Sequence, residues 1–387
     1  MYLLLAALLT ASIQYEDLPP PARTAIAADA SAFDSFLADI KRTTQQRLLA
    51  GDREHLAYFI LQSTSFTNLA PIEPAASAKQ LHQTKSIPPD VQARMDAFIA
   101  ALQQSPKGER LQYFASVKPE GLRIAYNEAM DFLYRKEFES KQNLNRIASL
   151  YESRGYSSDT SIEATFPVYL ALKRLPRANI KRVLIIGPGL DFAPRTALFD
   201  KYPPQSYQPY AVADALLSLG LTKEQDLQID CLDINPNVVQ FFDQQRAPQL
   251  HLPIKTLSPE HNAYTRQLGR KVGVRSGNQL TIRRSLARRI SATTGNILTD
   301  RLPHQYDLII ATNVLAYMPR RELLLALANV HAALAPGGWF IHNDLREDVE
   351  AFTKLFNFEP QYADMIALSE SATRGIFDAF VMHRKQP

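Results

Sequence analysis

Three short stretches, two of which follow apolar runs, carry residue types that could together bind a nucleoside. The run "VLII" is followed by Gly187 and Gly189, and glycine lets the backbone approach a ligand closely. The run "IDCL" is followed by Asp233, whose carboxylate can accept both hydroxyls of a ribose. The stretch "ATTGN" ends at Asn296, whose amide can hydrogen-bond the edge of an adenine. This order of residue types predicts a nucleoside cofactor.

Each position also has a purely structural interpretation. Two glycines after a strand often form only a tight turn, and Asp233 could cap the helix that follows it. An Asn that follows a glycine, as Asn296 does, is common in turns. Because the three signals occur in this order along the chain, the set favours binding.

Short apolar runs alternate with helical stretches from about residue 181 onward. The apolar runs are "KRVLIIG", "LQIDCLDIN", "YDLIIATNVL", "GGWFIHND" and "AFVMHRK", and the helical stretches are "QPYAVADALLSLG", "NPNVVQFFDQQRA" and "RRELLLALANVHAALA". This alternation predicts right-handed crossovers and a sheet that is covered on both faces. The expected fold is α/β, a Rossmann-like doubly wound and mostly parallel sheet. Ligands bind beyond the carboxyl ends of such strands, where the three polar positions fall.

An all-helical region is expected to precede this domain. Apolar residues recur at helical spacing in "SAFDSFLADIKRTTQQRLL", "DVQARMDAFIAALQQ" and "PEGLRIAYNEAMDFLYRKEFES". We expect helices over residues 14–155 and a Rossmann-like domain over 156–387, with a basic insertion at about 255–290. A chain of 387 residues is long enough for two such parts.

Residues 1–13 form a short apolar segment. It is too short to span a bilayer, and its length suits a signal peptide with a cleavage site near Thr10, Ala11 and Ser12. However, the first basic residue is Arg23, and the alternative is a short strand or helix packed on the body. The segment predicts export, for example to a periplasm. Without export the protein would be cytoplasmic.

Composition argues against several other kinds of site. The single cysteine, Cys231, excludes an internal disulfide and a multi-cysteine metal site, and the eight histidines show no metal-binding spacing. No metal site is expected. A net charge of +4 does not by itself argue for nucleic acid.

The glycine loop departs from the dinucleotide fingerprint. That fingerprint requires a third glycine at the position that Phe192 occupies here. A pyrophosphate seated on the start of a helix is therefore disfavoured. S-adenosyl-L-methionine carries no phosphate and does not need that seat.

Over roughly residues 157–385 the chain resembles the class I S-adenosylmethionine-dependent methyltransferases. "VLIIGPGLD" is similar to their glycine-rich motif, "IDCLDIN" to their ribose motif, and "GNIL" to their adenine motif, which usually has Asp where Asn296 stands. Within that superfamily, "QPYAVADALLSLG", "CLDINP" and "TNVLAYM" most resemble the chemotaxis-receptor methyltransferases, which esterify glutamate side chains. The resemblance implies S-adenosyl-L-methionine as the cofactor and methyl transfer as the activity.

The resemblance also implies roles for individual residues. Asn313 and Tyr317 would lie beside the methyl donor and are the catalytic candidates. Either Tyr317 or His342 could act as a base, although His342 is equally typical of a packed strand residue. The residues expected to bind the cofactor are Gly187, Pro188, Gly189, Asp191, Asp233, Ile234, Asn296, Ile297 and Asn313. Tyr156, Ser158, Asp159 and Thr160 could line the mouth of the site, although a cap for the helix that starts near Ile162 is the favoured interpretation of this segment.

A basic segment lies between the second apolar run and "TTGNIL". It contains no acidic residue, and its cations are Arg266, Arg270, Lys271, Arg275, Arg283, Arg284, Arg288 and Arg289. It predicts either an anionic partner or an exposed, solvated insertion, and the second interpretation is favoured. Aromatic residues are nearly absent from it, so there is no strong signal for nucleic acid.

The methyl acceptor is not identified by the sequence; a small molecule and a protein carboxylate both fit. Two other functions stay open. One is a degenerate, non-catalytic domain that binds a nucleoside or a partner protein. The other is an NAD-dependent oxidoreductase, which Phe192 disfavours.

Overall fold

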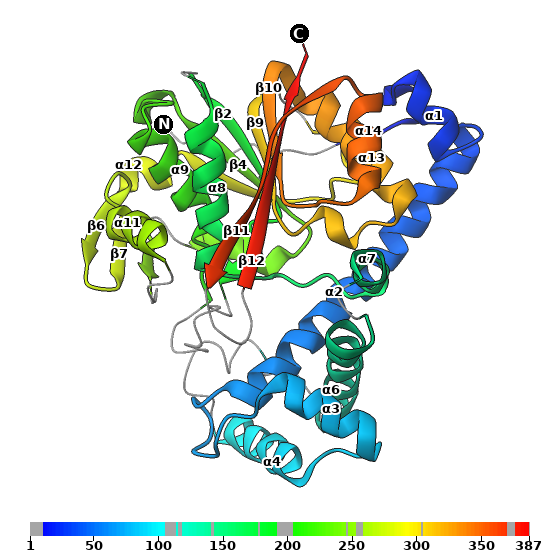
Figure 1. The fold of residues 1–387 in the computed structure, drawn as a ribbon, viewed down its shortest axis with the longest axis vertical. Coiled ribbons are helices and arrows are strands. Elements are labelled where there is room, and N and C mark those ends of the chain that lie inside the picture. Colours follow the sequence, from blue (N-terminus) through cyan, green and yellow to red (C-terminus); the bar gives the residue numbers. More distant parts are fainter. Residues whose placement is uncertain are drawn as a thin grey trace. The chain divides into compact units, whose positions relative to one another are not determined.

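The computed structural model of the protein forms two compact units, each described here by itself (Figure 1). The described residues are 11–104, 114, 118–140, 143–176, 179–191, 204–244, 247–252, 258–302, 305–369 and 376–386. The sheet unit comprises Met1–Arg42, Ile162–Gly189 and Ser206–Pro387, and the helical unit comprises Thr43–Ser161 and Leu190–Gln205.

Among the described residues, seven strands of the sheet unit form one sheet. In spatial order they are β11 (Phe358–Ser369), β12 (Ile376–Lys385), β10 (Leu334–His342), β9 (Tyr306–Ala311), β2 (Arg182–Ile186), β4 (Gln228–Asp233) and β8 (Ile290–Thr294). All neighbours pair in parallel except β12, which is antiparallel to both β10 and β11. The chain runs outward through β2, β4 and β8, then returns to β9 on the other side of β2. The expected doubly wound, mostly parallel sheet is confirmed, and its order reverses between β2 and β9.

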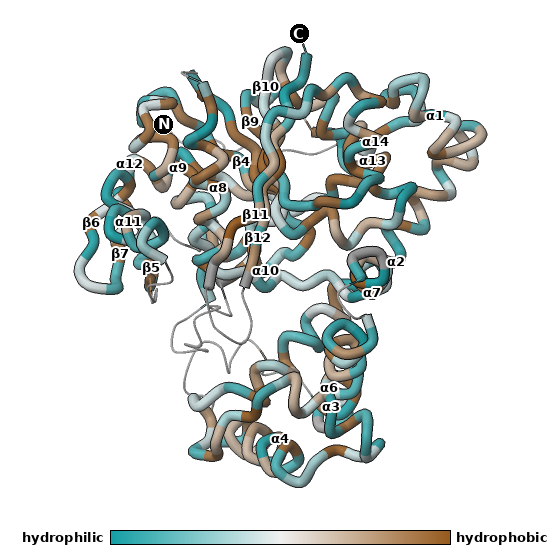
Figure 2. The backbone as a smooth tube through the Cα atoms, viewed as in Figure 1, coloured by the Kyte–Doolittle hydropathy of each residue, from teal (hydrophilic) through white to brown (hydrophobic). Residues whose placement is uncertain are grey.

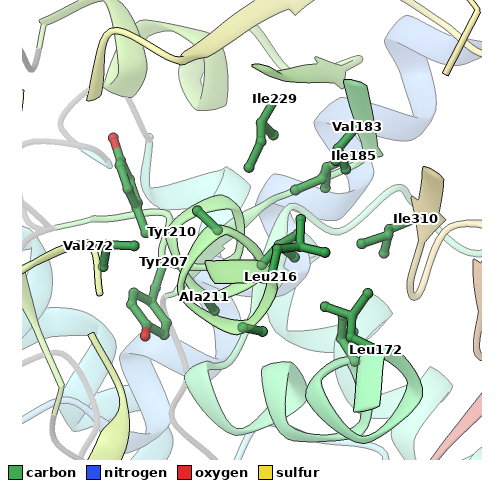
Figure 3. Packing of buried hydrophobic residues seen from close by; sticks show 14 of the residues in the cluster. Leu172, Val183, Ile185, Tyr207, Tyr210, Ala211, Leu216, Ile229, Val272 and Ile310 are labelled. Carbon is green, nitrogen blue, oxygen red and sulfur yellow. The ribbon is translucent and has the colours of Figure 1, made fainter. Parts of the chain in front are cut away.

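Apolar side chains leave the strands on both faces, because helices cover both. On one face Val183 and Ile185 of β2 pack with α8 (Thr165–Arg174) and α9 (Gln208–Ser218), and Figure 3 shows these side chains near Leu172 and Leu216. The alternate strand residues pack on the other face. The helices there are α1 (Pro20–Ile26), α13 (Arg320–Ala333) and α14 (Glu347–Leu355). Figure 2 shows the resulting hydrophobic colour along the central strands.

The N-terminal segment from Ala11 onward belongs to the sheet unit. The Ile13 amide donates to the Thr299 carbonyl at 3.0 Å, and the Arg301 amide donates to the Ala11 carbonyl at 2.7 Å. Ile13 is buried in the core on the α13 face, and η1 (Tyr15–Asp17) follows. The expected boundary near residue 155 therefore does not match the division of the chain, since residues 11–42 pack with the sheet.

Residues 1–10 lie outside the described residues, and export stays a prediction. No helix in the described part of the chain is long and apolar enough to cross a membrane.

The sheet unit carries an insertion between α10 (Pro236–Gln244) and β8. It contains a small antiparallel sheet of β5 (Gln249–His251), β7 (Gln279–Ile282) and β6 (Gly273–Ser276), with helices α11 (Pro259–Gln267) and α12 (Arg284–Ala287). The buried carboxylate of Asp214 in α9 accepts the backbone N–H groups of Gly269 at 2.9 Å and Lys271 at 2.7 Å. These bonds anchor the insertion to the main fold.

Helices and a two-stranded pair make up the described part of the helical unit. The helices are α2 (Ala30–Gln62), which contributes residues to both units, α3 (Pro74–Thr84), α4 (Pro89–Gln103), α6 (Pro119–Tyr134), η2 (Arg135–Glu139) and α7 (Leu144–Ser153). Phe59, Phe98 and Phe114 lie in their core. Strands β1 (Asp159–Thr160) and β3 (Leu190–Asp191) pair in parallel.

Candidate functional site

The loop after β2 adopts a backbone shape that requires glycine. Gly187 and Gly189 have φ angles of +64° and +65°, in the left-handed region that L side chains rarely adopt. A Cβ atom at Gly187 would lie 2.7 Å from the Cγ2 atom of Val314, which follows β9. The Gly187 amide donates to the Leu232 carbonyl of β4 at 2.8 Å. This loop therefore contacts segments from both neighbouring strands, with Pro188 buried between the two glycines.

Asp233 lies on the same side of the sheet as the glycine loop. Its Oδ2 atom accepts the backbone N–H of Gly189 at 3.3 Å, and its Oδ1 atom accepts that of Asn235 at 2.8 Å. The side chain is 6% exposed, and burial raises its pKa to about 6. Below that pH the carboxyl group is mostly neutral, and above it the group is an anion that accepts hydrogen bonds only.

Asn235, rather than Asp233, occupies the capping position before α10. Its side-chain oxygen accepts the backbone N–H of Asn237 at 3.0 Å, and its carbonyl accepts that of Val238 at 3.1 Å. The alternative interpretation of Asp233 as the helix cap is therefore wrong. Ile234, between these two residues, is half-buried.

Asn296 lies in the turn after β8. The Gly295 amide before it donates to the Asp233 carbonyl at 2.9 Å, which brings the turn next to the end of β4. The side-chain oxygen of Asn296 accepts the backbone N–H of Leu298 at 2.9 Å. The backbone N–H of Asn296 donates to the Asp300 carboxylate at 2.9 Å. Asn296 therefore stabilises a turn, as its purely structural interpretation expected. A contact between Asn296 and an adenine stays a prediction. Ile297 is buried in the core.

Asn313 follows β9 in a left-handed conformation, with φ at +58°. The backbone N–H of Asn313 donates to the Oδ1 atom of Asn343 at 2.8 Å. In return, the Nδ2 atom of Asn343 donates to the Oδ1 atom of Asn313 at 2.8 Å. Asn343 follows β10, so the ends of two adjacent strands are tied by a reciprocal pair. Asn343 was not among the candidates; the family resemblance selected Asn313, and only the place of Asn343 directly after the apolar run "WFIH" could have indicated it.

Arg346 holds the turn that contains Tyr317. Its guanidinium donates to the Asp344 carboxylate at 2.8–3.1 Å, to the Leu315 carbonyl at 2.6 Å and to the Met318 carbonyl at 3.0 Å. These carbonyls border η5 (Leu315–Tyr317), in which Tyr317 is buried. Neither Arg346 nor Asp344 was a candidate, and only their position after a strand end could have indicated them.

The expected mouth residues belong to the helical unit. Tyr156 stacks under the Arg47 guanidinium, 3.9 Å from the ring centroid, and its hydroxyl accepts from Arg47 at 2.9 Å. The Ser158 carbonyl accepts the Leu190 amide at 2.7 Å. Strand pairing matches Asp159 with Leu190 and Thr160 with Asp191, which places the Asp191 backbone in that unit. Phe192 lies outside the described residues.

His342 is a packed strand residue. Its Nε2 atom lies 3.2 Å from the Nδ1 atom of His383, and its Nδ1 atom accepts the Asp344 amide at 3.2 Å. It is buried, and burial lowers its pKa well below the ordinary value. The structural alternative therefore describes His342 better than a role as base.

The basic insertion divides into paired and exposed cations. Arg275 donates to the Thr265 carbonyl at 2.5 Å, and Arg283 donates to the Glu224 carboxylate at 2.5 Å. The exposed members are Arg266, Arg270, Lys271, Arg284 and Arg288. Within the described residues, no group of three or more His, Cys, Asp or Glu side chains could hold a metal ion.

Comparison with known proteins gives similarity in structure alone. The sequence matches no protein-family model and no curated protein. The N-methyltransferase NodS from Bradyrhizobium japonicum WM9, in complex with S-adenosyl-L-homocysteine, is 16% identical, covers 64% of this chain and 98% of its own, and has a TM-score of 0.34. Magnesium protoporphyrin IX methyltransferase (ChlM) from Synechocystis PCC 6803, with bound SAM, is 12% identical, covers 65% and 94%, and has a TM-score of 0.33.

The carbon methyltransferase CurJ is 13% identical, with coverage of 92% of this chain and 97% of its own and a TM-score of 0.35.

Proposed function

We propose that the sheet unit binds S-adenosyl-L-methionine and transfers its methyl group to an acceptor. The observation that carries this proposal is the contact between the Gly189 amide and the Asp233 carboxylate at 3.3 Å. It brings the glycine loop after β2 and the acidic end of β4 together beside the reversal of strand order, where a doubly wound sheet binds ligands.

The residues present fit an adenosine-containing cofactor. Above a pH of about 6 the Asp233 carboxylate is an anion that can accept two ribose hydroxyls. The loop of Gly187, Pro188 and Gly189 lets the cofactor approach the backbone, since side chains are excluded at both glycines. The polar ends of β8 and β9, at Asn296 and Asn313, supply further hydrogen-bonding groups.

For methyl transfer the protein mainly has to align the methyl donor with the acceptor. The cofactor supplies a methyl group that its sulfonium already activates. The chain's task is to hold the acceptor in line with that group and to exclude alternatives. Asn313 and Tyr317 follow β9 in a turn that Asn343 and Arg346 fix, so they are suited to positioning an acceptor. The acceptor is a small molecule or a protein carboxylate.

The exposed cations of the insertion favour a partner, distinct from the methyl acceptor, that carries negative charge. Arg266 in α11 and Arg284 in α12 are solvent-exposed, while Arg275 and Arg283 are held by internal bonds. Exposed charges act at a distance and are screened by salt. We expect capture of such a partner to weaken as ionic strength rises, which affinity measurements at two salt concentrations would reveal.

Titration calorimetry with S-adenosyl-L-homocysteine tests the cofactor. We expect saturable heat at one site per chain and no saturable heat with NAD. Binding of NAD alone would favour the oxidoreductase. Binding of S-adenosyl-L-homocysteine without methyl transfer to any acceptor, in a search with a radioactive methyl donor, would favour the non-catalytic domain.

A further inference from the structure

Two buried ionisable side chains of the sheet unit lack hydrogen-bond partners among the described residues. Both carboxylate oxygens of Glu163 have none, and the residue is 1% exposed. Both ring nitrogens of His261 have none, and that residue is 0% exposed. Buried polar groups are almost always paired, since leaving them unpaired costs free energy. Such groups are available to pair with a ligand or with ordered water.

Phe166 links the two positions, because it follows Glu163 in the chain and its ring contacts His261. Glu163 lies in η3 (Ile162–Ala164), directly before α8, and Phe166 follows three residues later on the same helical face. The ring of His261 in α11 meets the ring of Phe166 edge-on, with centroids 5.1 Å apart. Beside them the hydroxyls of Thr165 and Tyr264 lie 2.7 Å apart. These contacts bring the starts of α8 and α11 together.

The edge-on contact between His261 and Phe166 does not supply the missing hydrogen bonds of Glu163 and His261. At most one N–H group of His261 can point at the face of the Phe166 ring, which is a weak interaction. The second ring nitrogen and both oxygens of Glu163 would still lack partners.

This pair lies at the carboxyl edge of the sheet. α8 leads into β2 and α9 leads into β4, and just before these strands the Ile180 amide donates to the Leu221 carbonyl at 2.9 Å. Both helices therefore begin at the opposite, carboxyl edge. Gln208, the first residue of α9, confirms this by donating to Thr312 after β9 at 2.7 Å. The glycine loop and Asp233 lie at the same edge.

The chemistry of the pair favours a cation that donates hydrogen bonds. A carboxylate with two open oxygens accepts two parallel N–H groups, and such charge-assisted pairs are strong. The ring of Phe166 contacts His261 and Tyr264, and Tyr264 contacts Tyr169, so several aromatic rings gather beside His261; aromatic faces attract cations. Burial lowers the pKa of His261 to about 4, so the ring is neutral near pH 7 and does not repel a cation.

We propose that Glu163 and His261 form the subsite that binds a cationic, hydrogen-bond-donating group of the methyl acceptor, such as an ammonium or amidinium. The proposal rests on the methyltransferase function proposed above. It favours a small molecule with such a group over a protein carboxylate, because a second anion would be repelled by Glu163.

Benzamidine is a suitable probe, with neutral benzamide of the same shape as its control. We expect benzamidine to bind saturably in calorimetry, with benzamide and the Glu163→Gln variant each weaker by at least about 10-fold, equivalent to about 1.4 kcal/mol. Equal binding of the two probes, binding that Glu163→Gln leaves unchanged, or no saturable binding of benzamidine would overturn the proposal.

A stability measurement separates a ligand subsite from a structural role. Because Glu163 lacks partners, Glu163→Leu should raise the thermal midpoint, by about 2–4 °C. The matched control is Asp214→Leu, which should lower the midpoint because that carboxylate accepts two backbone N–H groups. A lower midpoint for Glu163→Leu would mean that ordered water satisfies the carboxylate, and the subsite would be refuted.

The same variants distinguish this proposal from the proposed function. Glu163→Leu should bind S-adenosyl-L-homocysteine as the natural protein does, while losing benzamidine. If the natural protein binds no S-adenosyl-L-homocysteine, the methyltransferase proposal fails, whatever the two probes do. If it binds S-adenosyl-L-homocysteine and the probes behave alike, the subsite alone fails.

Discussion

A buried arginine in the core of the helical unit and two buried carboxylates at the carboxyl edge of the sheet unit differ in how many hydrogen-bond partners they have. In the helical core the Arg94 guanidinium, 1% exposed, donates to the carbonyls of Ile60 at 2.6 Å and Leu69 at 2.7 Å, and also to those of Ser63 and Ala70. At the sheet edge Asp233 has only two backbone donors, and Glu163 has no partner among the described residues. Fully paired charges stabilise a scaffold, whereas under-paired charges are available to a ligand.

The largest effect on stability is expected from Arg94→Met, which removes the fully paired buried charge of the helical unit. The variant leaves several buried carbonyls unpaired, so the free energy of unfolding should fall by about 3–5 kcal/mol. Chemical denaturation would measure it. The affinity of the folded protein for S-adenosyl-L-homocysteine should not change, and a lost affinity would contradict a purely structural role.

Asp233 should show the opposite sign, because its charge is costly to bury. The folded pKa of about 6 lies above the ordinary 3.8, which corresponds to about 3 kcal/mol lost as pH rises through 6. Asp233→Asn should therefore be more stable than the natural protein at pH 8 by up to that amount. The difference should shrink to nothing near pH 4. Unfolding curves across this pH range would test it, and a less stable variant at pH 8 would contradict it.

Gly187→Ala tests whether the glycine loop is needed for cofactor binding as well as for stability. The left-handed φ costs about 1–2 kcal/mol for alanine, and the contact with Val314 adds to that cost. Gly220→Ala is the matched control, since its φ is +69° but nothing lies within 4 Å of an added Cβ. Both variants should lose stability, and Gly187→Ala alone should lose cofactor affinity. Equal affinities would show that the loop does not approach the cofactor.

Arg346→Lys should give the smallest change in stability, about 1 kcal/mol, because lysine keeps the charge opposite Asp344 but not the planar fork. Amide hydrogen exchange at Tyr317 and Met318 should become faster, since the bonds to Leu315 and Met318 are lost. Arg320→Lys, at an exposed ion pair with Asp348, is the control and should leave that exchange unchanged.

The central strands and their polar ends could be predicted from the sequence. β2 and β9 are apolar along nearly their whole length, and β4 and β10 contain shorter buried runs, which follows from burial on both faces. β11 was missed because it is an edge strand with exposed residues such as Tyr362 and Met365. β8, with the sequence "ISATT", was missed because its residues are mostly polar and half-buried.

The partners of the candidate residues could not be predicted, because they come from distant segments. Asn343 pairs with Asn313 across 30 residues, and Gly189 contacts Asp233 across 44. Glu163 and His261 carried no motif and are distinguished only by burial without partners. Local residue patterns placed the strand ends, while the contacts between them depend on the topology of the sheet.

Two aspartates of β4 allow the most direct test of the proposed cofactor site. Asp230 is buried in mid-strand and accepts from Ser291 at 2.7 Å, whereas Asp233 ends the strand beside the glycine loop. In calorimetry at pH 8, we expect Asp233→Asn to weaken binding of S-adenosyl-L-homocysteine by about 100-fold, because two charge-assisted hydrogen bonds are lost. Asp230→Asn should leave it nearly unchanged. Full affinity in the Asp233→Asn variant would contradict the claim that this strand end binds the ribose.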